Sequence, residues 1–95
     1  MIIAVDFDGT LTDRNGNPNS ALFSRLINEQ AHGGQIILWT CRTGESLKEA
    51  VMFCASYGLR FNYINENTAE TVRRLKCNPR KVLADMYIDD KAVMP

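Results

Sequence analysis

The sequence lacks any long hydrophobic run. None of its apolar stretches approaches the roughly 20 residues that a membrane span requires. The apolar run at the N-terminus has no basic region before it and is interrupted by Asp6, so we expect no signal peptide. The 11 basic and 11 acidic residues balance, so no overall electrostatic field directs the chain to nucleic acid.

Histidine and cysteine are scarce. His32 is the single histidine, which excludes Ser-His-Asp and Cys-His catalytic arrangements, and we interpret it as a helix-end residue. Cys41, Cys54 and Cys77 are odd in number and lack metal-ligand spacing, which favours reduced thiols in a cytoplasmic protein. Cys41 is close to a candidate site residue, but we interpret it as a buried structural thiol.

The remaining composition is that of one globular domain. A hydrophobic fraction of 45% is ordinary, and 95 residues allow a single domain over 1–95 with a modest core. Apolar periodicity predicts strands over 2–5, 36–39, 61–64 and 86–88. It predicts a helix over 19–32, a second helix that starts after Thr43 as N-cap and is closed by Gly58, and a third after Asn67, which with Glu70 is a possible capping box. This alternation predicts an α/β fold with parallel strands and right-handed crossovers.

Two carboxylates directly follow the first predicted strand. Asp6 and Asp8 are one residue apart, and i, i+2 side chains of an extended chain point the same way, so we expect them at one spot. Gly9 then lets the backbone turn away sharply. Two like charges this close require a cation or a shared proton, which indicates a metal or phosphoryl site. The alternative is an unusual turn.

A second acid pair, Asp89 and Asp90, follows the last predicted strand. Ligands of open parallel sheets bind beyond the carboxyl ends of the strands, so we expect both pairs to converge there. Four carboxylates would repel one another strongly unless a hard divalent cation, Mg²⁺ above all, bound their oxygens. Asp6, Asp8, Asp89 and Asp90 are therefore the candidate metal ligands.

Two more residues could serve a phosphoryl group. Thr40 ends a predicted strand, where its hydroxyl could donate to a phosphate oxygen or instead contact nearby backbone. Lys81, upstream of the last strand, could offset the carboxylates, although most lysines are simply exposed. Lys76 is a weaker candidate for the same role. Asn65 follows the third strand and is expected to line the pocket, as is Asn67.

In this order the four parts resemble the haloacid dehalogenase (HAD) superfamily of phosphohydrolases. The matching segments are Asp6-Phe7-Asp8-Gly9-Thr10, Thr40, Lys81 and Asp89-Asp90. The chain looks closest to a small capless subgroup, because Arg42 follows Thr40 by two residues and Ala84-Asp85 precede the last strand. The resemblance implies a three-layer, Rossmann-like parallel sheet with helices on both faces. It also implies a small flap between residues 9 and 19 and no cap domain, hence an open site.

The resemblance further implies a Mg²⁺-dependent phosphomonoester phosphatase that works through an aspartyl-phosphate intermediate. Asp6 would be the nucleophile. Asp8 would act as general acid and then general base, which requires a pKa well above that of a free aspartate. Thr40 and Lys81 would hold the phosphoryl oxygens.

The substrate is less well defined. Gly9, Thr10 and Arg42 are candidate substrate-binding residues, and Arg42 could either grip a second anionic group or form a surface ion pair. The basic stretch 73–81 could guide a polynucleotide or protein phosphate, or could be a solvated helix face. We expect a phosphorylated small molecule or macromolecular end as substrate, and a homo-oligomer is compatible with the sequence.

Alternatives stay open. The chain could be a non-catalytic module that binds Mg²⁺ or a phospho-ligand on the same fold. A receiver-type signalling domain also has acidic strand ends, but it carries its acceptor aspartate after a middle strand, where this sequence has Thr40. Proteins of the resembled superfamily usually continue with another strand after the acid pair, so a C-terminal strand could be missing.

Overall fold

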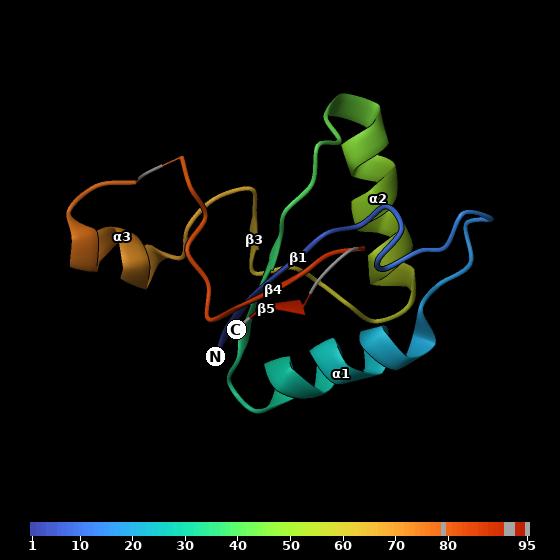
Figure 1. Cartoon of the computed structure of the whole chain (residues 1–95), viewed down its shortest axis with the longest axis horizontal. Helices are drawn as coiled ribbons and strands as arrows, with labels where there is room; N and C mark the ends of the chain where they lie inside the picture. The colour runs from blue at the N-terminus through green and yellow to red at the C-terminus, as the bar shows by residue number, and fades with distance from the viewer. Residues whose placement is uncertain (79, 91–92, 95) are drawn as a thin grey trace.

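Five strands form one sheet in the order β3-β2-β1-β4-β5 (Figure 1). The structure is a computed structural model that describes residues 1–78, 80–90 and the backbone of 93–94. The strands are β1 (Ile2–Val5), β2 (Gln35–Leu38), β3 (Tyr63–Ile64), β4 (Met86–Ile88) and β5 (Val93–Met94). β1 to β4 pair in parallel, and β5 runs antiparallel to β4. The predicted parallel α/β fold is confirmed, and a two-residue strand, β5, follows the second acid pair.

Two strands differ from the prediction in their bounds. β2 ends at Leu38, one residue before the predicted end, and Trp39 lies beyond it. β3 begins at Tyr63 because the Asn62 side chain replaces part of the backbone ladder. Its Oδ1 accepts a hydrogen bond from the backbone N–H of Ile36 at 2.7 Å. A polar side chain that pairs with the neighbouring strand therefore shortens β3, which an apolar pattern does not reveal.

In the described part of the chain, three helices connect the strands: α1 (Ser20–Ala31), α2 (Gly44–Ser56) and α3 (Ala69–Leu75). α1 begins as predicted, with Asn19 as N-cap accepting from the backbone N–H of Leu22 at 3.2 Å. The capping box predicted for α3 is wrong by one residue. The Thr68 hydroxyl, not Asn67, accepts from the N–H of Thr71 at 3.2 Å.

The core divides between the two faces of the sheet. The larger cluster combines β1, β2 and β4 with α1 and α2, and it includes Ile3, Val5, Phe23, Leu26, Ile36, Leu38, Ala50 and Cys54. The smaller cluster, on the opposite face, centres on Ala4, Ile37 and Val82, and its described members include no residue of α3. Each fully buried aliphatic side chain contributes roughly 1.5–3 kcal/mol. Both long helices therefore pack on one face, and a helical layer on the second face stays a prediction.

None of the helices in the described ranges is long and apolar enough to cross a membrane.

Candidate active site

The strand register brings the ends of three strands to one level. Val5 is paired with Leu38 on one side and with Ile88 on the other. Beyond the paired residues, the N–H of Asp6 donates to the Ile88 carbonyl at 3.0 Å, and the N–H of Trp39 donates to the Val5 carbonyl at 2.8 Å. Asp6 therefore lies between the segments that follow β2 and β4.

A cavity of about 290 Å³ opens at this level, and we call it the acid cavity. Its lining residues are Asp6, Trp39, Thr40, Cys41, Asp89 and Asp90. They come from the carboxyl ends of three parallel strands, where open α/β sheets bind ligands. The structure thus brings together four of the predicted site residues, which are separated in sequence by up to 84 positions (Asp90 minus Asp6).

The electrostatics of the acid cavity centre on Asp6. Burial raises the pKa of Asp6 above its usual value of 3.8, and the carboxylates of Asp8, Asp90 and Asp89 raise it further. The backbone N–H of Phe7 acts in the opposite direction by hydrogen bonding to the carboxylate. A half-buried carboxylate surrounded by three others is stabilised in its ionised form when a cation binds beside it.

Asp8 departs from the predicted arrangement. The strand ends at Val5, so the alternation expected to align Asp8 with Asp6 no longer applies. The Arg42 guanidinium instead holds the Asp8 carboxylate, with Nε at 2.9 Å from Oδ2 and Nη2 at 2.8 Å from Oδ1. Asp8 and Arg42 line a separate cavity together with Phe7.

The ion pair also contradicts the raised pKa expected for Asp8. The hydrogen bonds from Arg42 lower the pKa of Asp8 below its usual value of 3.8. Arg42 itself donates to the Ser46 carbonyl at 3.1 Å, and its guanidinium carbon lies 4.7 Å from the Phe7 ring centroid. Of the two roles considered for Arg42, an ion pair and the grip on a second anion, the structure contains the ion pair.

Thr40 is positioned through two contacts. Its backbone N–H donates to Oδ1 of Asn65 at 2.8 Å, and its hydroxyl accepts from the N–H of Arg42 at 3.2 Å. A hydroxyl that accepts still has its own proton to donate, and Thr40 lines the acid cavity. Asn65, which has a positive φ of 52°, was predicted to line the pocket. It instead braces Thr40 and is not among the residues that line the acid cavity.

Gly9 and Thr10 form the turn after the first acid pair. Gly9 has φ +76°, and a Cβ at this position would lie 3.2 Å from the Cβ of Asp90. The turn therefore needs glycine both for its dihedral angle and for the approach of Asp90. Thr10 is 6% exposed, and its hydroxyl has no partner among the described residues. Both residues line a cavity of about 420 Å³ that also contacts Asp89 and Asp90.

The predicted flap is a short closed loop. Thr12 bridges to Asp8 and to Pro18, which pins both ends of the segment. Within it, Oδ1 of Asp13 accepts from the backbone N–H groups of Asn15 at 2.8 Å and Asn17 at 2.9 Å. The segment predicted as a flap is thus a loop stabilised by one aspartate, Asp13.

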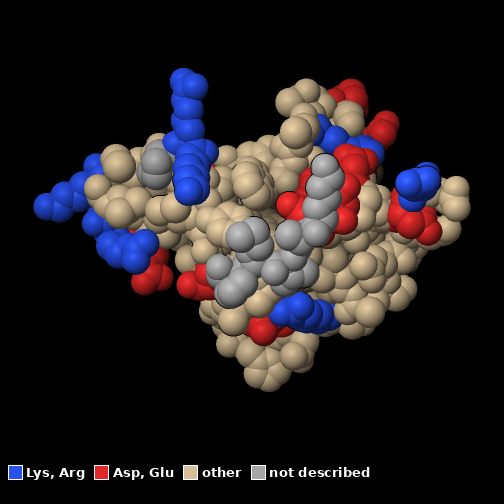
Figure 2. All heavy atoms as spheres, viewed as in Figure 1, with Lys and Arg blue, Asp and Glu red and all other residues tan. Residues whose placement is uncertain are grey.

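Lys81 and the basic stretch do not join the acid cavity in the described structure. Lys81 is exposed and is not among the described lining residues, and the same holds for Lys76. The Lys81 carbonyl accepts from Nδ2 of Asn67 at 3.1 Å. Asn67 was predicted to line the pocket. It is buried instead, and its Oδ1 accepts from the N–H of Leu83 at 2.7 Å, so it fastens the loop before β4. Figure 2 shows basic side chains over the α3 end and a group of acidic side chains on the α2 side.

The cysteines fit their prediction in part. All three are free thiols. Cys54 is buried in the core, and burial raises its pKa to about 12, which makes it inert. Cys41 is exposed and lines the acid cavity, so its interpretation as a buried structural thiol is wrong.

Trp39 also lines the acid cavity, although it was not predicted as a site residue. Its adjacency to Thr40 at a strand end is the signal that would have found it.

The metal prediction is not realised by the side chains as they lie. Across residues 1–78, 80–90 and 93–94, no group of three or more His, Cys, Asp or Glu side chains could hold a metal ion. The Asp8 carboxylate is engaged by Arg42, so among the atoms of Asp8 only the backbone carbonyl is left as a metal ligand. The remaining donors are the hard carboxylate oxygens that Mg²⁺ prefers, and their repulsion at Asp6 favours a cation. The donor chemistry therefore fits Mg²⁺, whereas the side-chain placement does not yet close a site.

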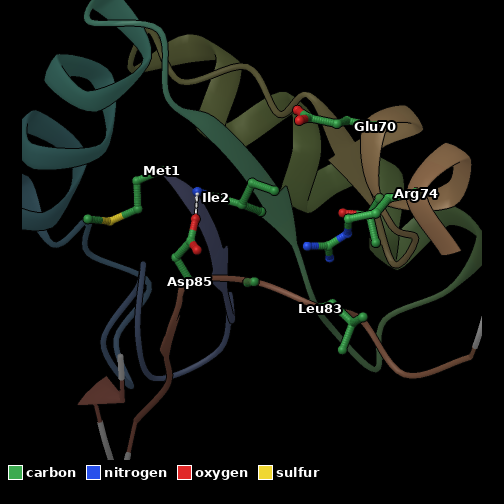
Figure 3. A pocket seen from close by; sticks show the side chains of 8 residues that line it. Met1, Ile2, Glu70, Arg74, Leu83 and Asp85 are labelled. Atoms are coloured by element: carbon green, nitrogen blue, oxygen red, sulfur yellow. Dashed lines mark hydrogen bonds between the residues drawn. The ribbon is translucent and has the colours of Figure 1, made fainter.

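Another cavity, of about 350 Å³, lies at the opposite end of the sheet (Figure 3). Met1, Ile2 and Asp85 form one side, while Glu70 and Arg74 face it from α3. The Asp85 carboxylate accepts from the N–H of Ile2 at 2.6 Å, so it serves the strand pairing. This cavity separates the short helix α3 from the start of β1 and contains none of the predicted site residues.

Comparison with known proteins gives a relative of known structure. No protein-family model matches the chain, and a search of curated proteins found no match. A solved structure, described as that of the conserved protein coded by locus from Bacteroides thetaiotaomicron, is 35% identical with a TM-score of 0.82. The alignment covers 97% of this chain and 77% of that one. The chain therefore belongs to the same family as this conserved Bacteroides thetaiotaomicron protein.

Proposed function

We propose that the protein is a Mg²⁺-dependent phosphomonoester phosphatase of the HAD type. One observation carries the proposal. A carboxylate with a raised pKa, Asp6, shares a cavity with the Thr40 hydroxyl and the Asp89-Asp90 pair, each delivered by a different strand. Phosphoryl transfer depends mainly on positioning and on electrostatic stabilisation, which such a set of groups supplies.

Asp6 is the proposed nucleophile. One of its carboxylate oxygens bonds to phosphorus while the bond from phosphorus to the ester oxygen breaks, and the leaving oxygen takes a proton from Asp8. Water then attacks phosphorus in the aspartyl phosphate and passes its proton to Asp8. The bond to the Asp6 oxygen breaks, and inorganic phosphate leaves. Thr40 donates to a phosphoryl oxygen in both steps, and Lys81 is proposed to approach the same group.

Mg²⁺ would be held by Asp6, Asp89 and Asp90 together with the backbone carbonyl of Asp8. When bound, it supplies positive charge against the phosphoryl oxygens and screens the carboxylates from one another. The intervals between the motifs leave no room for a cap domain, so we propose that the site is open to water.

The ion pair with Arg42 places a condition on this mechanism. Asp8 has to carry a proton when the leaving group departs, and the two hydrogen bonds from Arg42 favour its ionised form. Asp8 must therefore leave Arg42 before the first step. Its side chain is 59% exposed, so solvent and the adjacent cavity are accessible to it once the ion pair breaks.

The test is release of inorganic phosphate from an aryl phosphate with and without Mg²⁺. We expect release only with Mg²⁺ and a loss of at least about 100-fold in Asp6→Asn, since removing a covalent nucleophile can cost up to about 10⁶-fold. Glu29→Gln is the matched control, because it removes one negative charge on α1 outside the acid cavity. Activity within tenfold of wild type in a folded Asp6→Asn protein would defeat the nucleophile assignment.

A non-catalytic binding module is the second candidate. The observation in its favour is that Asp8 is held by Arg42, which leaves the acid cavity without a group ready to protonate a leaving oxygen. This candidate predicts that Mg²⁺ and inorganic phosphate raise the melting temperature while no ester is hydrolysed. Hydrolysis that depends on Asp6 excludes it.

A further inference from the structure

Trp39 is the unusual residue of the acid cavity. It is the single tryptophan of the chain and is 44% exposed, although the three residues before it are fully buried. Tryptophan is normally buried over most of its surface. Here it lies beside Asp6 and Thr40, the two groups assigned to the phosphoryl group.

The indole of Trp39 packs against the ring of Tyr87, which is held in place by its hydroxyl. The indole centroid lies 5.6 Å from that of Tyr87, with an interplanar angle of 60°. The Tyr87 hydroxyl donates to the Val82 carbonyl at 2.7 Å and accepts from the N–H of Ala84 at 3.0 Å. We call this pair, Trp39 on Tyr87, the aromatic platform. Because Tyr87 is fixed at its hydroxyl and its ring contacts the indole, a ligand ring that contacts the platform has less to order there.

The surroundings of the platform favour a small ligand over a protein or membrane surface. Three carboxylates, those of Asp6, Asp89 and Asp90, line the same cavity. A macromolecular surface that covered Trp39 would have to desolvate them, which is unfavourable for charged groups. A phosphate ester can instead place its phosphoryl group at Thr40 and an apolar ring on the indole. The cavity volume of about 290 Å³ has room for one phosphoryl group and one ring.

We propose that Trp39 selects phosphate esters whose leaving group carries a planar aromatic ring, such as nucleoside monophosphates or aryl phosphates. The inference rests on the proposed phosphatase function and adds its substrate class. Stacking of a base on an aromatic side chain is sequence-tolerant, because every base presents a π-face. An aliphatic ester such as glycerol phosphate gains nothing from the platform.

Binding can be tested apart from turnover, because Trp39 is the only source of tryptophan fluorescence. We would titrate the Asp6→Asn protein, with Mg²⁺ present, with phenyl phosphate, a nucleoside 5′-monophosphate and glycerol phosphate. Saturable quenching by an aromatic ester and none by glycerol phosphate supports the platform. A response to both aromatic esters shows that any planar ring is recognised. A response to only one of them shows whether the substrate ring is a phenyl group or a nucleoside base. Equal responses to all three esters, or none to any, overturn the proposal.

Turnover gives the second test. We expect Trp39→Leu to lower kcat/KM for the preferred aromatic ester by about 10- to 100-fold. Hydrolysis of glycerol phosphate should change less than about threefold, and Trp39→Phe should recover part of the loss. An equal loss for both esters, in a variant that melts like the wild type, would show a structural role and overturn the proposal. If the wild type hydrolyses no ester, the phosphatase proposal fails, while the fluorescence titration still decides on the platform.

Discussion

The Arg42 guanidinium binds the Asp8 carboxylate through two parallel hydrogen bonds, 2.9 Å from Nε and 2.8 Å from Nη2. The two residues are 34 positions apart and follow different strands. Bidentate pairs of this kind are the strongest ordinary carboxylate contacts, and they favour the ionised carboxylate. Asp8, which the sequence predicts to be the general acid, is thus held in its ionised form by Arg42.

The pKa values of the two aspartates of the first motif should be shifted in opposite directions. Carbon-detected NMR of the carboxyl groups should give Asp6 a pKa above 3.8 and Asp8 a pKa below 3.8. A lowered pKa means that the stability contributed by Asp8 is present above 3.8 and is lost as the pH falls through the lower value. In Arg42→Gln the Asp8 midpoint should rise, while an unchanged midpoint would contradict the ion pair in solution.

Arg42 should also set the pH dependence of hydrolysis, if Asp8 must be protonated to act. Without the guanidinium the pKa of Asp8 rises, so the alkaline limb of the kcat/KM profile should move to higher pH in Arg42→Gln. Arg42→Lys keeps the charge without the bidentate geometry, so its alkaline limb should lie between those of the wild type and Arg42→Gln. Profiles that coincide for all three proteins would rule out a role of Asp8 as acid.

Asp6→Asn should stabilise the fold at neutral pH. The raised pKa of Asp6 means that its ionised form is unfavourable in the folded state, so the gain is present above the raised pKa and disappears as the pH falls below 3.8. Allowing for solvent screening, we expect a few tenths to about 1 kcal/mol in the free energy of unfolding by urea.

The contrasting variant is Asp13→Asn in the flap. Hydrogen bonds from the N–H groups of Asn17 and Asn15 lower the pKa of Asp13, so removing its charge should destabilise the protein above 3.8. Effects of the same sign in Asp6→Asn and Asp13→Asn would contradict the pKa directions given for the two residues.

Gly9→Ala should be more harmful than Gly16→Ala. Both glycines have positive φ, +76° and +81°, so both alanines carry a similar backbone strain of roughly 1–2 kcal/mol. The Gly9 variant must in addition displace Asp90, whose Cβ would lie 3.2 Å away, whereas Gly16 has no atom within 4 Å among the described residues. We expect Gly9→Ala to lose more stability in urea unfolding and also to lose hydrolysis. Equal losses in the two variants would mean that Asp90 moves without cost.

Much of the fold follows from local pattern. β1 and β4 have the predicted bounds, because each is a short apolar run followed immediately by charge. The same pattern identified Asp6, Asp89 and Asp90 as strand-end groups. Parallel pairing then brought them to one cavity, since parallel strands end at the same edge of a sheet.

The sequence by itself determined which residues stand at the strand ends, because strand periodicity and chain order are local properties. Only the tertiary structure decided where the side chains beyond those ends turn. Asp8 turns to Arg42, Trp39 stays exposed on Tyr87, and Asn67 is used to fasten a loop. Each of these outcomes depends on a partner from a distant segment. No periodicity within the chain encodes such a partner, so its identity appears only when the sheet has formed.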